Sequence, residues 1–350
     1  MNPDILKNYD PNAAGVTTNT IFGLPFNTAN ARVVFIPVPW DVTVSNHAGT
    51  AKGPENILAK SFQIDLYDPV APNAWKNGMA MERIDQGIVQ KNEATRALAK
   101  EVIDFLESGG DPATDKESLT KLNKVNAECN ALMSIVESKS LKYLENGQLP
   151  VIVGGDHSVT LGLIRALAGN QEFGILQIDA HADLRKDYEG FTNSHASIMR
   201  NVLSVCNVSK ILQIGIREIC PEEENIMAAQ PDRIKTYFDH ELYHRLFKGE
   251  SWAAICEEIA NSLPENVYIT FDVDGLEPAC CPGTGTPVPG GLSYNQALFL
   301  LETVVRKGKR ILGADLVETG PGNIDGIVSC RLLYRLAGML IKSNEHNEGK

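Results

Sequence analysis

The sequence predicts an α/β fold of three layers, in which helices cover both faces of a mostly parallel sheet. Segments with strand character alternate with segments of helical spacing over most of the 350 residues. Two of the strand segments, 149–154 and 174–178, are almost entirely apolar, which is typical of parallel strands buried on both faces. With 43% hydrophobic and 22% charged residues, the chain can form one large core, and we expect a single domain.

The first third of the chain contains a predicted strand and three predicted helices. The strand lies at 33–38, and a helix at 54–61 begins with proline, which suits a first helical residue because its missing N–H has no partner there. Apolar spacing predicts two further helices, at 92–107 and 120–147. Residues 1–30 are rich in Asn, Thr, Gly and Pro, and we expect an arm on the surface or on a neighbouring subunit.

The remaining elements continue the alternation. Strands are predicted at 149–154, 174–178, 210–216, 234–237, 267–271 and 310–317. Helices are predicted at 159–168, 222–229, 239–248, 251–262, 293–307 and 324–341. No domain boundary is evident, so 31–341 is predicted to be one unit, followed by a flexible polar tail at 342–350.

Charge and composition restrict the class of protein. The formal net charge of −12 argues against nucleic acid or an anionic membrane as the main partner and favours a small cationic substrate. The seven cysteines lack CxxC spacing, so we expect reduced thiols and no disulfide framework. Neither a signal peptide nor an apolar run of about 18 residues is evident, which predicts a cytoplasmic protein.

Three predicted strands end in acidic residues and histidines. The motifs are GGDHS at 154–158, DAHAD at 179–183 and DVDG at 272–275. Alternate residues of an extended chain point to one side, so Asp179, His181 and Asp183 are expected to converge. In open α/β sheets, ligands bind beyond the carboxyl ends of the strands, where these motifs lie. Taken singly, each motif also fits a turn or a helix cap, a role we expect for Asp156 or Ser158.

Together the motifs predict a metal centre, because adjacent buried carboxylates are costly without a cation. The candidate ligands are His157, Asp179, His181, Asp183, Asp272 and Asp274. Six are too many for one tetrahedral zinc ion but suit two divalent ions. The oxygen-rich set favours Mn²⁺, with Fe²⁺, Co²⁺ and Ni²⁺ as alternatives. Two ions can hold a bridging hydroxide, so the predicted chemistry is hydrolysis.

These motifs resemble those of the ureohydrolases, the family of arginases, agmatinases and other guanidino-group hydrolases. The resemblance runs from about residue 33 to 340. It rests on GGDHS (154–158), DAHADLR (179–185), SHASIMR (194–200), FDVDGLEP (271–278), GTGTPVPGG (283–291) and DLVETGPG (315–322). It implies an arginase-like fold, two metal ions per chain, and a homo-oligomer that is a trimer or a hexamer.

The resemblance also implies roles for individual residues. One metal ion would be bound by His157, Asp179, Asp183 and Asp272, and the other by Asp179, His181, Asp272 and Asp274. Asp183 would orient the hydroxide that attacks the guanidinium carbon. Glu318 would bind the guanidinium, because a carboxylate can pair two of its N–H groups. His195 would pass a proton to the departing amine, with a pKa near neutrality. Thr286 is expected to support the metal-binding carboxylates, and His47 lies near a substrate loop of the family.

The segment after the DAHAD motif is more similar to agmatinases than to arginases. The predicted reaction is therefore the conversion of agmatine to putrescine and urea, with guanidinase, guanidinobutyrase or arginase activity as alternatives. Arg185 and Arg200 would bind a substrate carboxylate if they faced the site, but pairing with Asp187 or Glu189 is the favoured interpretation. Remoter alternatives are a deacetylase-like enzyme with one zinc ion and a catalytically silent metal-binding subunit.

Overall fold

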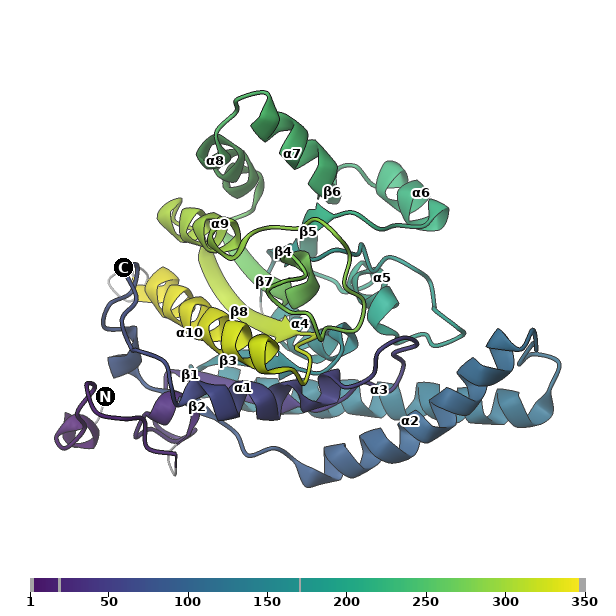
Figure 1. Ribbon diagram of the computed structural model, residues 1–350, viewed down its shortest axis with the longest axis horizontal. Coiled ribbons are helices and arrows are strands. Elements are labelled where there is room, and N and C mark those ends of the chain that lie inside the picture. The colour runs from purple at the N-terminus through teal and green to yellow at the C-terminus, as the bar shows by residue number, and fades with distance from the viewer. Residues whose placement is uncertain (1–2, 18–19, 170, 346–350) are drawn as a thin grey trace.

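The computed structural model describes residues 3–17, 20–169 and 171–345, which form an eight-stranded sheet covered by helices (Figure 1). The strand order is β2-β1-β3-β8-β7-β4-β5-β6, and every pairing of neighbours is parallel. The strands are β1 (Val33–Val38), β2 (Met79–Met81), β3 (Leu149–Gly154), β4 (Phe173–Ile178), β5 (Val208–Ile216), β6 (Ile234–Phe238), β7 (Asn266–Asp272) and β8 (Arg310–Val317). The parallel sheet predicted from the sequence is confirmed.

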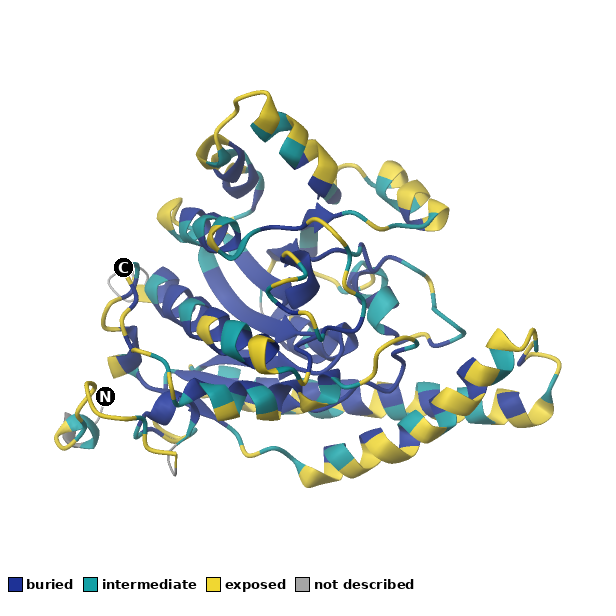
Figure 2. Cartoon of the chain, in the orientation of Figure 1, coloured by how far each residue is buried: buried dark blue, intermediate teal, exposed yellow. Residues whose placement is uncertain are grey.

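Helices form the two outer layers. They are α1 (Gly53–Ser61), α2 (Gln86–Glu107), α3 (Lys116–Glu145), α4 (Leu161–Ala168), α5 (Ile198–Val202), α6 (Pro221–Ala229), α7 (Asp239–Phe247), α8 (Trp252–Ser262), α9 (Tyr294–Arg306) and α10 (Asn323–Glu345). On one side α1, α10, α9 and α8 pack in succession, and on the other α2, α3, α4 and α5 do so (Figure 1). The strands are almost wholly buried, whereas the outer faces of the helices are exposed (Figure 2). No helix in the described ranges is both long and apolar enough to span a bilayer.

The segment 21–26 departs from the surface arm predicted for residues 1–30. Ile21, Phe22, Leu24 and Phe26 are buried in the core, and the Phe22 ring packs edge-on against two aromatic rings, with the nearer centroid 5.1 Å away. The prediction is wrong for this segment because four apolar side chains lie close together in it. Burying each of them stabilises the fold by about 1.5–3 kcal/mol relative to exposure.

The last helix is longer than predicted. Helix α10 continues to Glu345, and both Ser343 and Asn344 are buried. The Ile311 N–H donates to Ser343 Oγ at 3.1 Å, and Asn344 Nδ2 donates to the Ile311 carbonyl at 2.8 Å. The prediction of a frayed tail is therefore wrong for 342–345, which are bonded to β8, while 346–350 lie outside the described residues.

The order of the central strands positions the site. Strands β3, β8, β7 and β4 are consecutive neighbours and run in the same direction. Their carboxyl ends therefore lie at one edge of the sheet, and each is followed by one of the acidic or histidine-containing motifs. Segments far apart in the chain, such as 154–158 and 315–322, meet there because parallel pairing aligns the strand ends.

Candidate metal centre and active site

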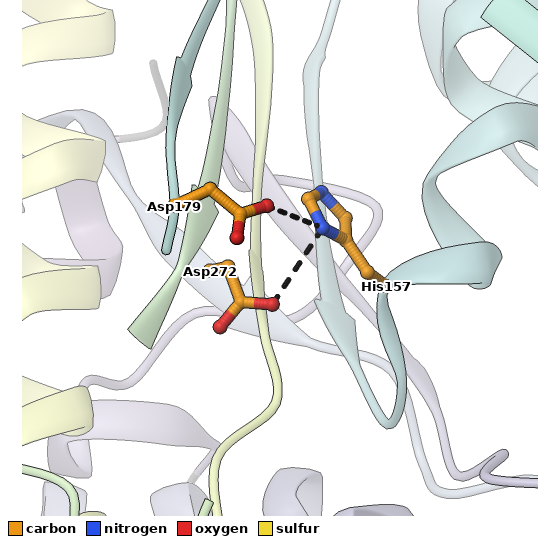
Figure 3. A group of neighbouring side chains, drawn as sticks. All are labelled: His157, Asp179 and Asp272. Atoms are coloured by element: carbon orange, nitrogen blue, oxygen red, sulfur yellow. Dashed lines mark ion pairs between the residues drawn. The ribbon is translucent and has the colours of Figure 1, made fainter. Parts of the chain in front are cut away.

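Two buried clusters of carboxylates and imidazoles occupy this edge. In the first, His157 Nδ1 lies 3.1 Å from Asp179 Oδ2, 3.0 Å from Asp183 Oδ2 and 3.6 Å from Asp272 Oδ2. Figure 3 shows the Asp179 and Asp272 carboxylates pointing at the same nitrogen of the His157 ring. These side chains lie at or just beyond the carboxyl ends of β3, β4 and β7, so three separate strands build one small cluster.

The second cluster adjoins the first through Asp179. His181 Nδ1 lies 3.0 Å from Asp274 Oδ2 and 3.7 Å from Asp179 Oδ1. In each of the triads His157–Asp179–Asp272 and Asp179–His181–Asp274, the candidate ligand atoms lie within 4.8 Å of one another. The structure thus brings together all six side chains selected from the sequence, in two groups that could each hold a metal ion.

The electrostatics of the clusters fit bound cations. Burial and then the neighbouring Asp179 raise the pKa of Asp183 to about 7. Burial, followed by Asp274 and Asp179, raises the pKa of Asp272 well above its usual range. Only Asp274 has a lowered pKa, because the attraction of His181 outweighs the effect of burial. The carboxylates therefore repel one another in a dry site, and positive charge would relieve that repulsion.

A hydrogen-bonded relay from two strands orients the His157 ring. Its Nε2 lies 2.7 Å from Thr270 Oγ1, and this hydroxyl donates to Asp315 Oδ1 at 2.9 Å. A hydroxyl has one proton, so Thr270 must accept from the Nε2–H of His157. In the neutral ring this leaves the lone pair on Nδ1, which faces the carboxylates and suits a metal ligand. The supporting roles of Thr270 and Asp315 were not predicted from the sequence: Thr270 is marked only as a polar residue inside an apolar strand, and Asp315 only as the first residue of the DLVETGPG motif.

A second polar relay holds Asp179. Gln177 Nε2 donates to Asp179 Oδ2, Gln213 Nε2 donates to Gln177 Oε1, and Thr236 Oγ1 donates to Gln213 Oε1, each at 2.8 Å. The relay crosses β4, β5 and β6, and both glutamines are fully buried. Because every member has a partner, the relay fixes the Asp179 carboxylate without leaving unsatisfied groups. These glutamines were also missed by the sequence reasoning.

Glu318 and Asp183 have unusual backbone conformations. Their φ angles are 62° and 53°, in the left-handed region that non-glycine residues rarely adopt and that is enriched at functional sites. Glu318 Oε1 accepts the His157 N–H at 2.9 Å, whereas its buried Oε2 has no hydrogen-bond partner in the described part of the chain. Burial and then Asp156 raise the pKa of Glu318 well above its usual range. A cationic donor would satisfy this oxygen and stabilise its charge.

The expected cap role is confirmed for Asp156. Its carboxylate accepts the Ser158 N–H at 3.0 Å at the start of a short 3₁₀ helix, His157–Thr160. The turn also requires Gly155, because a Cβ at that position would lie 1.9 Å from the Trp40 carbonyl oxygen. Thus the residues around His157 position its ring, while His157 itself faces the cluster.

A cavity of about 470 Å³ opens over the second cluster. Its lining residues are Ser45, Asn46, His47, His181, Asp183, Arg185, Tyr188, His195, Ala196, Glu218, Glu223, Thr286 and Pro287. Glu318 is not among them. A methyl group on Gly285 would lie 3.5 Å from Glu318 Oε2 and 3.6 Å from the His47 carbonyl oxygen. Because Gly285 has no side chain, space remains between Glu318 Oε2 and His47, which lines the cavity.

His195 lines this cavity, and the Tyr188 ring lies edge-on to it with centroids 6.2 Å apart. Burial, then the nearby His181 and His157, lower the pKa of His195 to about 3. The near-neutral pKa expected from the sequence is therefore wrong for the chain as described, and the ring is neutral at pH 7. The adjacent Ser194, rather than His195, caps the following turn. Thr286 Oγ1 lies 3.5 Å from Asp274 Oδ2, at the long end of hydrogen bonding.

Arg185 does not pair with Asp187 or Glu189 as favoured from the sequence. Its guanidinium lies over the Tyr188 ring, 5.1 Å from the centroid, and it lines the cavity. Among the described residues it forms no ion pair within 4.0 Å. The pairing interpretation is wrong for Arg185 because the short turn between Tyr188 and Phe191 places the aromatic ring beneath the guanidinium. Arg200 is not part of the cavity lining.

The fold and the clusters together define a metal-binding α/β protein whose site lies at the carboxyl edge of a parallel sheet. Comparison with known sequences is more specific, since the arginase family matches residues 31–338. The chain belongs to the arginase family, the ureohydrolases, as its motifs indicated.

Individual relatives agree with this assignment. The N(1)-aminopropylagmatine ureohydrolase of Synechocystis sp. is 30% identical over 315 residues, 89% of each chain. The agmatinase of Halalkalibacterium halodurans is 28% identical over 296 residues, covering 84% of this chain and 86% of the relative. The solved structure of proclavaminate amidino hydrolase from Streptomyces clavuligerus superposes with a TM-score of 0.72 at 21% identity, covering 95% of this chain and 99% of the other. The last likeness concerns the fold.

Proposed function

We propose that the protein is a binuclear ureohydrolase that converts agmatine and water to putrescine and urea. The observation that carries the proposal is the position of Asp179, which has one oxygen near His157 and the other near His181. A carboxylate placed in this way suits a bridge between two metal ions. Two such clusters also favour a ureohydrolase with two metal ions over a deacetylase-like enzyme with one zinc ion.

Two divalent ions, for which the oxygen-rich ligands favour Mn²⁺, would supply Lewis-acid activation of a water molecule at this site when bound. We assign their ligands to His157, Asp179, Asp183 and Asp272 for one ion, and to Asp179, His181, Asp272 and Asp274 for the other. The hydrogen bond from His157 to Thr270, 2.7 Å long, presents the correct nitrogen of that ring. The chain itself contributes a set of metal ligands that hydrogen bonds hold in place before any ion binds.

The remaining residues act on the substrate and on protons. The free Oε2 of Glu318 would accept an N–H of the guanidinium and orient its central carbon towards the water. The Asp183 carboxylate would hold the attacking water by accepting a hydrogen bond. His195, kept neutral by burial, has one N–H and one lone pair. It can therefore take a proton from water and pass it to the departing amine.

One observation favours a second candidate substrate, a guanidino acid such as 4-guanidinobutyrate. Arg185 lines the cavity with no ion pair in the described structure, and its planar guanidinium could bind the carboxylate of such a tail in bidentate fashion. Glu218 lines the same cavity with its side chain 67% exposed, and it could instead bind the ammonium of agmatine. The two side chains therefore favour opposite substrate charges.

The decisive experiment measures urea release by the Mn²⁺- or Ni²⁺-loaded protein. Agmatine, arginine, 4-guanidinobutyrate, 3-guanidinopropionate and guanidine are the substrates, and we expect the highest kcat/KM for agmatine. R185Q and E218Q form a matched pair. E218Q should lower kcat/KM for agmatine while R185Q lowers it only for guanidino acids. No urea from any of the five compounds, with two metal ions bound per chain, would contradict the proposal.

The assembly and location of the protein belong to the same proposal. The family resemblance favours a homo-oligomer, a trimer or a hexamer, and a cytoplasmic location is proposed with it. Light scattering of the purified protein would measure its molar mass, and a monomer would contradict the first expectation. Metal content measured on the same sample distinguishes two ions per chain from one.

A further inference from the structure

Helix α7 carries a second set of side chains that can bind metal, none of which belongs to the two clusters. Its sequence includes His240-Glu241-Leu242-Tyr243-His244, and residues four apart lie on the same face of a helix. The His240 and His244 ring centroids are 6.0 Å apart, with the ring planes at 85°. Helix α7 follows the edge strand β6 (Figure 1), whereas the metal centre lies beyond the ends of the central strands.

Both imidazoles are available to a ligand. His240 and His244 are exposed, and in the described chain neither ring forms a hydrogen bond or an ion pair. Among the described residues, their ring contacts are with each other and between His240 and Phe238, at 5.8 Å. Desolvation therefore costs little on binding, and the two side chains can rotate to place one nitrogen each at 2.0–2.1 Å from a common ion, the usual Zn–N distance.

The surroundings do not compete with a cation. Arg245 follows His244, but its guanidinium is paired with Glu250 at 2.6 Å and Glu258 at 2.7 Å. Glu241 is exposed beside the histidines and adds a negative charge to this face of the helix. The buried Leu242 attaches the opposite side of the helix to the core, which keeps the two histidines in register.

The chemistry of the pair selects the kind of ion. Imidazole ligands suit Zn²⁺, Ni²⁺ and Cu²⁺, and they are poor ligands for Mg²⁺ or Ca²⁺. A helical His-Glu-x-x-His segment is the zinc-binding element of one class of metalloproteases, where the glutamate acts as a base. Those catalytic sites have a third protein ligand. Two groups of three candidate ligands occur among the described residues, and neither contains a residue of α7. The α7 pair therefore lacks the third protein ligand of a catalytic site.

We propose that His240 and His244 chelate one Zn²⁺, Ni²⁺ or Cu²⁺ ion on the surface of α7, with water at the remaining positions. The site binds a metal and does not form a second hydrolytic centre. It is independent of the ureohydrolase centre, because no residue is shared between them.

Equilibrium dialysis of the Mn²⁺-loaded protein against Zn²⁺ tests the site. The variants are H240Q, H244Q and the double variant, and K248Q, one residue beyond the end of the helix, is the control. Total metal per chain, Zn²⁺ plus Mn²⁺, is counted so that exchange at the centre does not matter. We expect each single histidine variant to bind one ion fewer than the wild type, the double variant to lose no more than either single, and K248Q to lose none. Retention of the untagged protein on immobilised Ni²⁺ should fall in parallel.

Two results would overturn the proposal. Unchanged metal content in the double variant would show that α7 holds no ion. Losses that add up between the two single variants would show two independent histidines rather than one chelate. Urea release by the double variant should equal that of the wild type. If the proposed ureohydrolase activity is wrong, all variants and the wild type will fail to release urea equally, which distinguishes that failure from loss of the α7 site.

Discussion

Replacing Thr270 by valine tests how the fold prepares a metal ligand. Valine has nearly the same shape but lacks the hydroxyl that accepts from His157 Nε2 at 2.7 Å and donates to Asp315 Oδ1 at 2.9 Å. The substitution removes no candidate metal ligand and lies beneath the cluster. Any change in metal binding must therefore act through the orientation of the His157 ring.

The structure indicates the size of the effect. Asp315 retains two donors, the Tyr268 hydroxyl at 2.7 Å and the Phe271 N–H at 3.2 Å, so the loss falls mainly on His157. A buried N–H left without a partner costs about 1–3 kcal/mol, and we expect the free energy of unfolding to fall by that amount. Losing the group that orients a metal-binding histidine typically reduces metal affinity or activity by about 10–100-fold.

The assay is a Mn²⁺ titration of urea release, combined with direct measurement of bound metal and with urea denaturation of the metal-free protein. T270S is the matched control, because it keeps the hydroxyl and loses only a methyl group. Affinity should fall in T270V and stay within about threefold of wild type in T270S. Wild-type metal affinity in T270V would refute the reasoning, since the ring would then need no hydrogen bond to present Nδ1.

Three further predictions concern the substrate, protons and the backbone. E318Q should lower kcat/KM by at least about 10²-fold, since it loses a buried charge partner of the guanidinium, and it should still bind two metal ions; wild-type turnover would contradict the role of Glu318. Burial lowers the pKa of His181, but Asp274 and then Asp179 raise it to about 10 from 6.5. Protonated His181 therefore stabilises the metal-free protein fully below pH 6.5, and this stabilisation is lost as the pH rises towards 10. Denaturation of the EDTA-treated protein as a function of pH measures this loss, and a free energy of unfolding that increases from pH 6.5 to 10 would contradict the prediction. The stability of the Mn²⁺-loaded protein should instead increase with pH, because metal binding needs a neutral imidazole. G155A, whose Cβ would meet the Trp40 carbonyl oxygen at 1.9 Å, should destabilise the protein by about 3 kcal/mol. G169A is the control, because Gly169 is exposed, has a helical backbone and has 3.7 Å of space for a Cβ. Equal stability of the two variants would argue against the close approach at Gly155.

Much of the fold followed from local patterns. Apolar runs located seven of the strands, all but the three-residue β2, and the alternation with helices predicted the parallel sheet. Errors arose where tertiary contacts decide the outcome. Residues 21–26 have no regular period, yet their apolar side chains enter the core. The polar end of α10 remains helical because β8 supplies partners to Ser343 and Asn344.

For the candidate site, too, the sequence predicted some residues, and tertiary contacts decided the others. The six ligands could be predicted because each motif is continuous in the sequence and ends a strand. The residues that orient them could not, because Thr270 and Asp315 belong to different strands, and their contact exists only when β7 and β8 pair in the observed register. The position of Arg185 over Tyr188 likewise depends on a turn whose shape the sequence did not indicate.

By itself, the sequence determined the class of fold, the family and the set of side chains that can bind metal, since these depend on periodicity and on residue types at short spacing. Only the tertiary structure decided that Thr270 orients His157, that Glu318 has an unpaired oxygen, and that Arg185 lines the cavity. The physical reason is that each of these facts is a distance between segments far apart in the chain. Such distances follow from strand order and register, which the local sequence does not encode.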